Sequence, residues 1–207
     1  MKKFLITGLM LGAILFSATG VQADNTISPK LEKIKTLLQQ QKSGDATTLL
    51  NQLTPKEAEE LASYVEFKSQ EVPPIYFIFL ADSVYKNDKD KALLFYNIGK
   101  VRAYEDVMMC KDNTAKAQLS IYPSLAPKTI KYLSTKIKNK KYIADLMQKT
   151  LDWDTSHPDR YNPIWACYHG ISAKTNGQPQ LIEESKRAAV IENARQELKD
   201  TIKKYSE

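Results

Sequence analysis

The sequence has few of the residues and motifs from which catalytic and metal-binding sites are built. Its 207 residues include only two histidines and two cysteines. It lacks the G-x-S-x-G turn of many hydrolases, and its histidines and cysteines follow no known zinc-ligand spacing. The sequence therefore predicts no catalytic residue, no metal and no cofactor, and an enzyme ranks third among the function classes that we consider.

Long apolar runs are also scarce, and the longest lies at the N-terminus. It covers residues 4–17, which are too few to span a bilayer comfortably. Lys2 and Lys3 precede this run, and Val21-Gln22-Ala23 follows it with the small residues that signal peptidase requires. These are the three parts of a secretory signal peptide, so we predict cleavage after residue 23.

The functional chain then comprises residues 24–207, and a chain of this length is expected to form a single domain. The short basic start resembles bacterial signal peptides, which favours the periplasm as the location, with secretion from the cell as the alternative. An uncleaved N-terminal anchor is the alternative. No apolar stretch after Ala23 is long enough to cross a membrane, so we predict no transmembrane segment in the mature chain.

The charge of the chain is nearly balanced. It has 30 basic and 24 acidic residues. Loss of Lys2 and Lys3 with the signal peptide lowers the net charge from +6 to about +4. Such a mild excess favours solubility and identifies no partner, and export argues against nucleic acid.

The two cysteines are Cys110 and Cys167. An even number of cysteines in an exported chain predicts a disulfide, here one that closes a loop of about 58 residues. Two buried free thiols are the alternative.

Proline and N-cap residues divide the mature chain into helices. Ser28-Pro29, Thr54-Pro55 and Asn162-Pro163 each combine an N-cap residue with a proline at the first helical position. Thr54 is followed by Glu57, which completes a capping box. Apolar residues recur at helical spacing between these signals, and we expect a single all-α domain of about seven to nine helices with one disulfide.

Two segments define the centre of this domain. Residues 75–80 read IYFIFL, which also suits a buried strand, but the run continues to Tyr85 and no second strand exists to pair with it. Residues 89–109 are apolar around most of a helix circumference, which is typical of a central helix. We expect a loop over residues 152–161 and a final helix over residues 181–205.

Residues 80–103 carry small and aromatic residues at regular places in two successive helices. They include Leu80-Ala81, Lys91-Ala92-Leu93, Phe95-Tyr96 and Gly99. In these positions the segment resembles a single tetratricopeptide-like or Sel1-like repeat, although Ala81 replaces the glycine of that family and no second copy occurs. Because repeat arrays need several copies to bury their faces, the resemblance implies one packed helix hairpin and not a solenoid. Such families usually bind proteins.

Residues 153–170 hold both tryptophans and both histidines of the chain. Such a composition is typical of a protein-binding surface. We expect the polar stretch 154–160 to be exposed, with Trp165, Cys167 and Tyr168 buried behind it. The alternative is that the aromatic residues fill the core and the segment is structural. The candidate partner-binding residues are Trp153, Asp154, His157, Arg160 and Tyr161.

The same segment contains residue types that bind metals or attack substrates. The ligand types are Asp154, His157, Cys167 and His169, but a disulfide would remove Cys167 from the set. Ser156, His157 and Asp159 are the residue types of a hydrolytic triad, yet neighbours in sequence rarely adopt its geometry. We adopt neither interpretation.

One basic cluster occurs, and it consists of Lys136, Lys138, Lys140 and Lys141. Charge runs are mostly solvated faces. The functional alternative is weak contact with an anionic envelope surface or with an acidic partner.

Together these features predict an exported, periplasmic protein-interaction module whose partner is another protein. Its sharpest form is an immunity or inhibitor protein against an envelope-acting toxin or hydrolase. The alternative is an adaptor or chaperone-like helper in envelope assembly.

Overall fold

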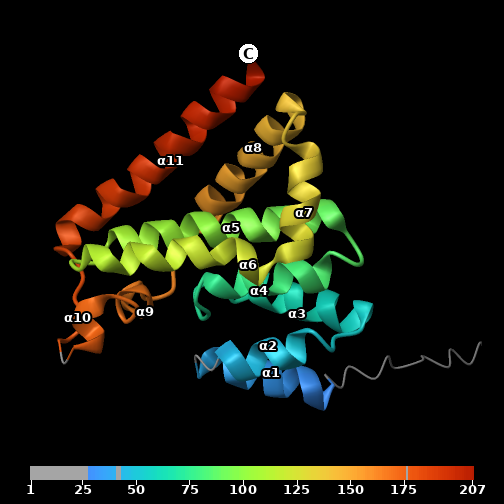
Figure 1. The fold of residues 1–207 in the computed structure, drawn as a ribbon, viewed down its shortest axis with the longest axis horizontal. Coiled ribbons are helices and arrows are strands. Elements are labelled where there is room, and N and C mark those ends of the chain that lie inside the picture. Colours follow the sequence, from blue (N-terminus) through green and yellow to red (C-terminus); the bar gives the residue numbers. More distant parts are fainter. Residues whose placement is uncertain (1–27, 41–42, 176) are drawn as a thin grey trace, which may run out of the picture.

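The computed structural model describes residues 28–40, 43–175 and 177–207 (Figure 1). The predicted signal peptide, residues 1–23, lies outside them. The described chain is all-α, and its only β-type pairing is an isolated bridge between Cys110 and Leu181. None of its helices is long and apolar enough to cross a membrane.

The α-helices of the described residues are connected by short turns, with one 3-10 helix, η1 (Asn113–Ile121), after α5. In chain order the α-helices are α1 (Pro29–Gln39), α2 (Ser43–Leu50), α3 (Pro55–Phe67), α4 (Ile75–Val84), α5 (Lys89–Met108), α6 (Tyr122–Leu125), α7 (Pro127–Lys136), α8 (Lys140–Ser156), α9 (Ile164–Cys167), α10 (Ile171–Lys174) and α11 (Glu184–Ser206).

The predicted start signals are confirmed for α1 and α3. The Ser28 hydroxyl accepts a hydrogen bond from the Leu31 amide at 3.2 Å. Thr54 and Glu57 form the reciprocal capping box, in which the Thr54 amide donates to the Glu57 carboxylate at 2.8 Å. These side chains satisfy backbone amides that have no partner within the helix.

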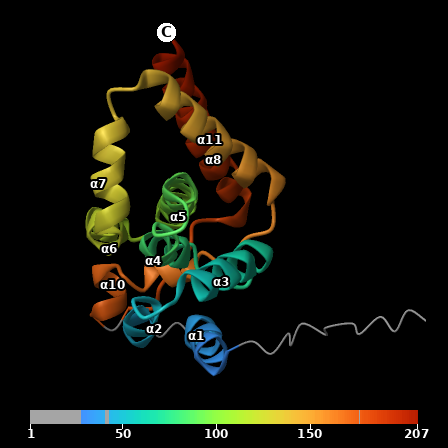
Figure 2. The same cartoon turned by 90° about the vertical axis from the view of Figure 1, so that its right-hand side faces the viewer.

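The central helix is α5, as predicted. It packs against α4, α8, α7 and η1, and α3 packs on α4 (Figures 1 and 2). The short helix α2 contacts α1 and α4, whereas α8 and α11 lie antiparallel on the other side of α5. Buried side chains from α1 to α9, among them Phe77 and Phe95, form a hydrophobic cluster along α4 and α5.

The hairpin of α4 and α5 depends on one close contact at Gly99. A β-carbon at this position would lie 2.8 Å from Cγ1 of Ile78 and 2.9 Å from the β-carbon of Phe77. Glycine therefore lets the two helices approach each other closely. The packed hairpin expected over residues 80–103 is present, and its relation to the repeat family stays a resemblance.

Two predicted boundaries are wrong. Helix α8 continues to Ser156, so the expected loop begins only at His157. The last helix begins at Glu184, three residues later than expected, because the preceding residues pair with the end of α5. In that pairing the Ile182 amide donates to the Met109 carbonyl at 2.8 Å.

The predicted disulfide is confirmed. Cys110 follows the end of α5 and Cys167 ends α9, and their Cα atoms lie 5.4 Å apart. The bond therefore ties the short helix α9 to the central helix.

Candidate partner-binding site

Asp154 lies at the centre of a buried ionic cluster, although we expected it to be exposed. It is on the face of α8 that points toward α5, and only 1% of its surface is accessible. Its carboxylate accepts hydrogen bonds from Arg102 at 2.9 Å, from Arg160 at 2.8 Å and from Arg195 at 2.8 Å. These arginines come from α5, from the segment after α8 and from α11, so a single carboxylate joins three elements.

Arg102 also holds the chain that follows α8. Its guanidinium lies 4.7 Å from the centre of the Trp153 ring. It donates hydrogen bonds to the backbone carbonyls of Asp154, His157 and Asp159. The turn that we expected to be a free loop is therefore attached to the central helix.

Two further acids on α5 complete the cluster. Glu105 is fully buried and pairs with Arg160, and its second oxygen, Oε1, has no hydrogen-bond partner among the described residues. The buried Asp106 accepts a hydrogen bond from the Trp165 indole at 2.6 Å. With Asp154 the cluster holds three acids and three arginines, which balances the charge when all are ionised.

The surroundings of these acids shift their pKa values in two directions. Burial raises the pKa of Glu105 to about 7 against the opposing charge of Arg160. It likewise raises the pKa of Asp106 to about 7 against the hydrogen bond from Trp165. At Asp154 burial acts in the same direction, but the neighbouring arginines outweigh it, so the pKa of Asp154 lies below its ordinary value.

The expectation that residues 154–160 form an exposed surface is therefore wrong for Asp154 and Arg160. The physical reason is that α8 extends into the segment and turns Asp154 toward arginines that lie far away in the sequence. His157 is half-buried, and its ring stacks on Trp153 with centroids 4.2 Å apart. Tyr161 is also half-buried and packs against the hydrophobic core.

The geometry around His157 does not suit a hydrolytic triad. Its Nδ1 lies 3.0 Å from the Ser156 hydroxyl and 2.8 Å from the Trp153 carbonyl. A carbonyl only accepts hydrogen bonds, so Nδ1 carries the proton and cannot take one from serine. Cys167 is oxidised to a disulfide, and the described residues hold no group of three side chains suited to a metal ion.

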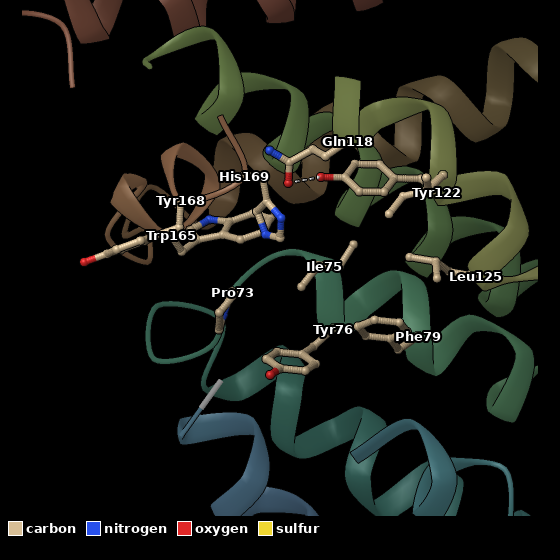
Figure 3. Close-up of a pocket in the computed structure, with 11 residues that line it drawn as sticks. Pro73, Ile75, Tyr76, Phe79, Gln118, Tyr122, Leu125, Trp165, Tyr168 and His169 are labelled. Carbon is tan, nitrogen blue, oxygen red and sulfur yellow. Dashed lines mark hydrogen bonds between the residues drawn. The ribbon is translucent and has the colours of Figure 1, made fainter. Parts of the chain in front are cut away.

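An apolar groove lies beside the cluster, on the other side of Trp165. Its volume is about 240 Å³, and α4, η1, α6 and α9 contribute to its walls. Figure 3 shows Ile75, Tyr76 and Phe79 of α4 on one side, with Trp165, His169 and Tyr122 on the other. The sequence did not indicate this groove, because its walls come from segments that are distant along the chain.

The rim of the groove exposes two large apolar side chains. Tyr168 is 57% exposed, so the expectation that it is a buried anchor is wrong, whereas Trp165 and Cys167 are buried as expected. Helix α9 ends after one turn, which leaves Tyr168 at its C-terminal end facing solvent. Ile121, at the end of η1, is 52% exposed and lines the same groove.

The polar groups of Gln118 and Tyr122, in the floor of the groove, are paired within the protein. The Gln118 amide donates to the Ala166 carbonyl at 3.0 Å, and its oxygen accepts from the Tyr122 hydroxyl at 3.1 Å. His169 lies at the edge, where burial and the charge of Lys174 lower its pKa. The neutral form is thereby favoured, and the groove offers an apolar surface.

The four lysines of the predicted basic cluster lie at the turn between α7 and α8. Lys138, Lys140 and Lys141 are exposed. Lys136 is half-buried, and its ammonium lies 5.0 Å from the centre of the Tyr132 ring and 5.2 Å from that of Tyr142. The turn lies at the opposite end of α7 from α6, one of the helices that line the groove (Figures 1 and 2).

No protein-family model, characterised protein or solved structure matches the chain.

Proposed function

We propose that the chain is an exported, periplasmic protein-interaction module that binds its partner through the apolar groove between α4 and α9. The observation that carries this proposal is the exposed pair Tyr168 and Ile121 above a buried apolar floor. Exposed aromatic and aliphatic side chains around a pocket are typical of the centre of a protein–protein interface. A weaker contact of Lys136, Lys138, Lys140 and Lys141 with an anionic envelope surface is part of the same proposal.

The size of the groove favours a partner side chain over a small molecule. A volume of about 240 Å³ lies below the range of about 300–1,000 Å³ that is usual for small-molecule pockets. One or two apolar side chains of a partner would fill it. The disulfide at Cys167 holds the α9 wall on the central helix, which reduces the ordering that binding would require.

The sharpest form of the proposal is an immunity or inhibitor protein that acts on an envelope toxin or hydrolase. A rigid, disulfide-tied helical domain suits that role, and a disulfide is compatible with an oxidising compartment. The alternative is an adaptor or chaperone-like helper in envelope assembly. The two roles differ in whether the bound partner loses an activity.

The test is partner capture from an envelope extract of cells that make the protein. Tyr168→Ala combined with Ile121→Ser should remove the specifically captured protein while leaving the thermal midpoint nearly unchanged. The matched control is Phe67→Ser on α3, because Phe67 is 78% exposed and does not line the groove. This control should capture the partner as well as wild type.

Equal capture by the groove variant and wild type would contradict the proposal. Once the partner is identified, adding the protein to it in a stoichiometric titration separates the two roles. An inhibitor abolishes the partner's toxin or hydrolase activity, whereas an adaptor leaves that activity intact.

A further inference from the structure

We infer that the turn between α7 and α8 binds the surface of an anionic phospholipid bilayer, with Ile137 entering the headgroup region. We call residues 136–141 the α7–α8 tip. The inference rests on the proposed location in the cell envelope and deepens it by naming the lipid class and the inserted side chain. It is independent of the apolar groove.

Along the sequence, the charge on both sides of the tip has one sign, although Asp90 of α5 lies close enough to interact with Lys136. Residues 126–144 contain six lysines and no acidic residue. Within the described residues, none of these lysines forms a salt bridge. Asp145, in the second turn of α8, is the first acid that follows. Unpaired lysines are complementary to a surface of anionic headgroups.

The tip also exposes an isolated apolar side chain. Ile137 lies directly after α7, between Lys136 and Lys138, and is 56% exposed. Within the tip it is the single apolar residue. An apolar side chain flanked by lysines is the arrangement by which a protein inserts shallowly between headgroups while its ammonium groups stay at the phosphates.

The structure holds the tip in one orientation. The hydroxyls of Tyr132 on α7 and Tyr142 on α8 both donate to Oδ1 of Asp90 on α5, at 3.1 and 2.6 Å. The Asn139 amide donates to the Lys136 carbonyl at 2.8 Å, and the Asn139 side chain caps α8. A tip that is already ordered loses little conformational entropy on binding.

The end of α11 extends the basic surface. In both views the C-terminus lies at the same end of the molecule as the turn between α7 and α8 (Figures 1 and 2). Lys203 and Lys204 are exposed there, although Asp200 and Glu207 partly offset their charge. A bilayer is broad enough to contact both places at once.

A lipid surface fits the tip better than an acidic protein does. Protein interfaces have a core of aromatic and apolar residues from which charges are depleted. At the tip the only exposed large apolar residue is Ile137, and lysines surround it. Lysines around a single small apolar element are typical of peripheral contact with a membrane surface.

The test measures binding to vesicles of phosphatidylglycerol mixed with phosphatidylcholine, with phosphatidylcholine alone as the neutral reference. The protein is purified in the form in which cells make it, and intact mass records its N-terminus, so all variants share the same processing. The tip variant is Lys138→Gln, Lys140→Gln and Lys141→Gln together. The matched control removes the same charge from the exposed Lys33, Lys86 and Lys174.

We expect wild type to bind the anionic vesicles and to bind the neutral ones much more weakly. Raising the salt concentration should weaken binding to the anionic vesicles and leave a small part that depends on Ile137. Each basic residue near an anionic bilayer strengthens binding about fivefold, so the tip variant should bind about 100-fold more weakly. The control variant should change binding only a few-fold. Ile137→Ser should weaken binding several-fold and remove the part that persists at high salt.

Four outcomes would overturn the inference. The first is equal binding of wild type to neutral and anionic vesicles, and the second is an equal loss of vesicle binding in the tip and control variants. The third is unchanged vesicle binding by Ile137→Ser. The fourth is no vesicle binding together with tip-dependent binding to polyglutamate. The last result would identify an acidic protein as the partner. Tyr168→Ala should not change vesicle binding, so failure at the tip and failure at the groove remain separate results.

Discussion

The chain uses charged residues in opposite ways in two regions. Around Asp154, the acids of α5 and α8 and Arg102 are buried, and the half-buried Arg160 and Arg195 pair with these acids. At the α7–α8 tip, Lys138, Lys140 and Lys141 are exposed and form no salt bridge among the described residues. A buried charge is costly unless it is paired, whereas an exposed charge costs the fold almost nothing. The charges of the first region are therefore committed to contacts within the fold, and those of the second are free to serve binding.

This contrast explains why composition alone is ambiguous. The segment 153–161 has the Trp, His and Arg content of a recognition surface, yet most of those side chains hold α8 and the following turn on α5. The tip has a composition that usually means a solvated face. What separates the two regions is whether each charge has a partner, and that depends on tertiary structure.

The largest effect is expected from removing the centre of the buried cluster. Asp154→Ala should lower the free energy of unfolding by about 3 to 5 kcal/mol, because it leaves the buried Arg102 and its two neighbouring arginines without their shared carboxylate. Chemical denaturation measures this change. Asp152→Asn is the matched control, since Asp152 is exposed on the same helix, and it should stay within about 0.5 kcal/mol of wild type. A similar small loss for both variants would show that the cluster does not stabilise the fold.

The disulfide should have the next largest effect. Replacing Cys110 and Cys167 by alanine should lower the free energy of unfolding by roughly 2 to 4 kcal/mol, because the unfolded chain regains the entropy of an open loop. Denaturant titration of the double variant gives the value. Labelling of free thiols in freshly purified native wild type would contradict the bond itself. The tip should keep its vesicle binding in this variant wherever the protein remains folded.

The pH dependence of stability should reveal the two raised acids. In the unfolded chain Glu105 and Asp106 release their protons near their ordinary pKa values of 4.5 and 3.8, but in the folded chain they keep them to about pH 7. Because the folded state then binds more protons, the free energy of unfolding should fall as pH rises from 5 to 7 and level off above that. Asp154 acts in the opposite sense, and its contribution should be lost only as pH falls below about 4.

Urea denaturation across pH 5 to 8 checks this sign. We expect a fall on the order of 1 kcal/mol or more in wild type, given about 1.4 kcal/mol per unit of pKa difference. Glu105→Gln, which resembles the protonated acid, should have a shallower dependence. A stability that rises through this window would show that both acids are ionised and well paired in the folded protein.

Much of the fold could be predicted because its signals are local. The caps at Ser28 and Thr54, the long apolar α5 and the pair Cys110–Cys167 each identify themselves by residue type and spacing. The end of α8 could not be predicted in this way. The sequence Asp-Thr-Ser-His-Pro favours a turn, but Arg102 and Arg195 reach Asp154 from distant helices and hold the last turn of α8 in place.

The candidate groove was not predictable for the same reason. Ile121 and Tyr168 are 47 residues apart in the sequence, and nothing near either one shows that they share a rim. Tyr168 follows the buried Trp165 and Cys167, so its neighbours favoured burial. Only the early end of α9 turns it outward. The lysine cluster was predictable as a cluster, whereas the exposure of Ile137 within it was not.

The smallest effects are expected at the tip, where they provide the finest test of the comparison. The triple variant Lys138→Gln, Lys140→Gln and Lys141→Gln should change the free energy of unfolding by less than about 0.5 kcal/mol, and removal of like-charge repulsion could make that change stabilising. Lys136→Gln should differ from it. The Lys136 ammonium lies over the rings of Tyr132 and Tyr142, so its loss should cost about 0.5 to 1 kcal/mol. Urea denaturation midpoints resolve this difference when wild type, the triple variant, Lys136→Gln and Ile137→Ser are compared. If the triple variant proves as destabilised as Lys136→Gln or more so, these lysines stabilise the fold, and the distinction between a structural cluster and a free binding surface fails.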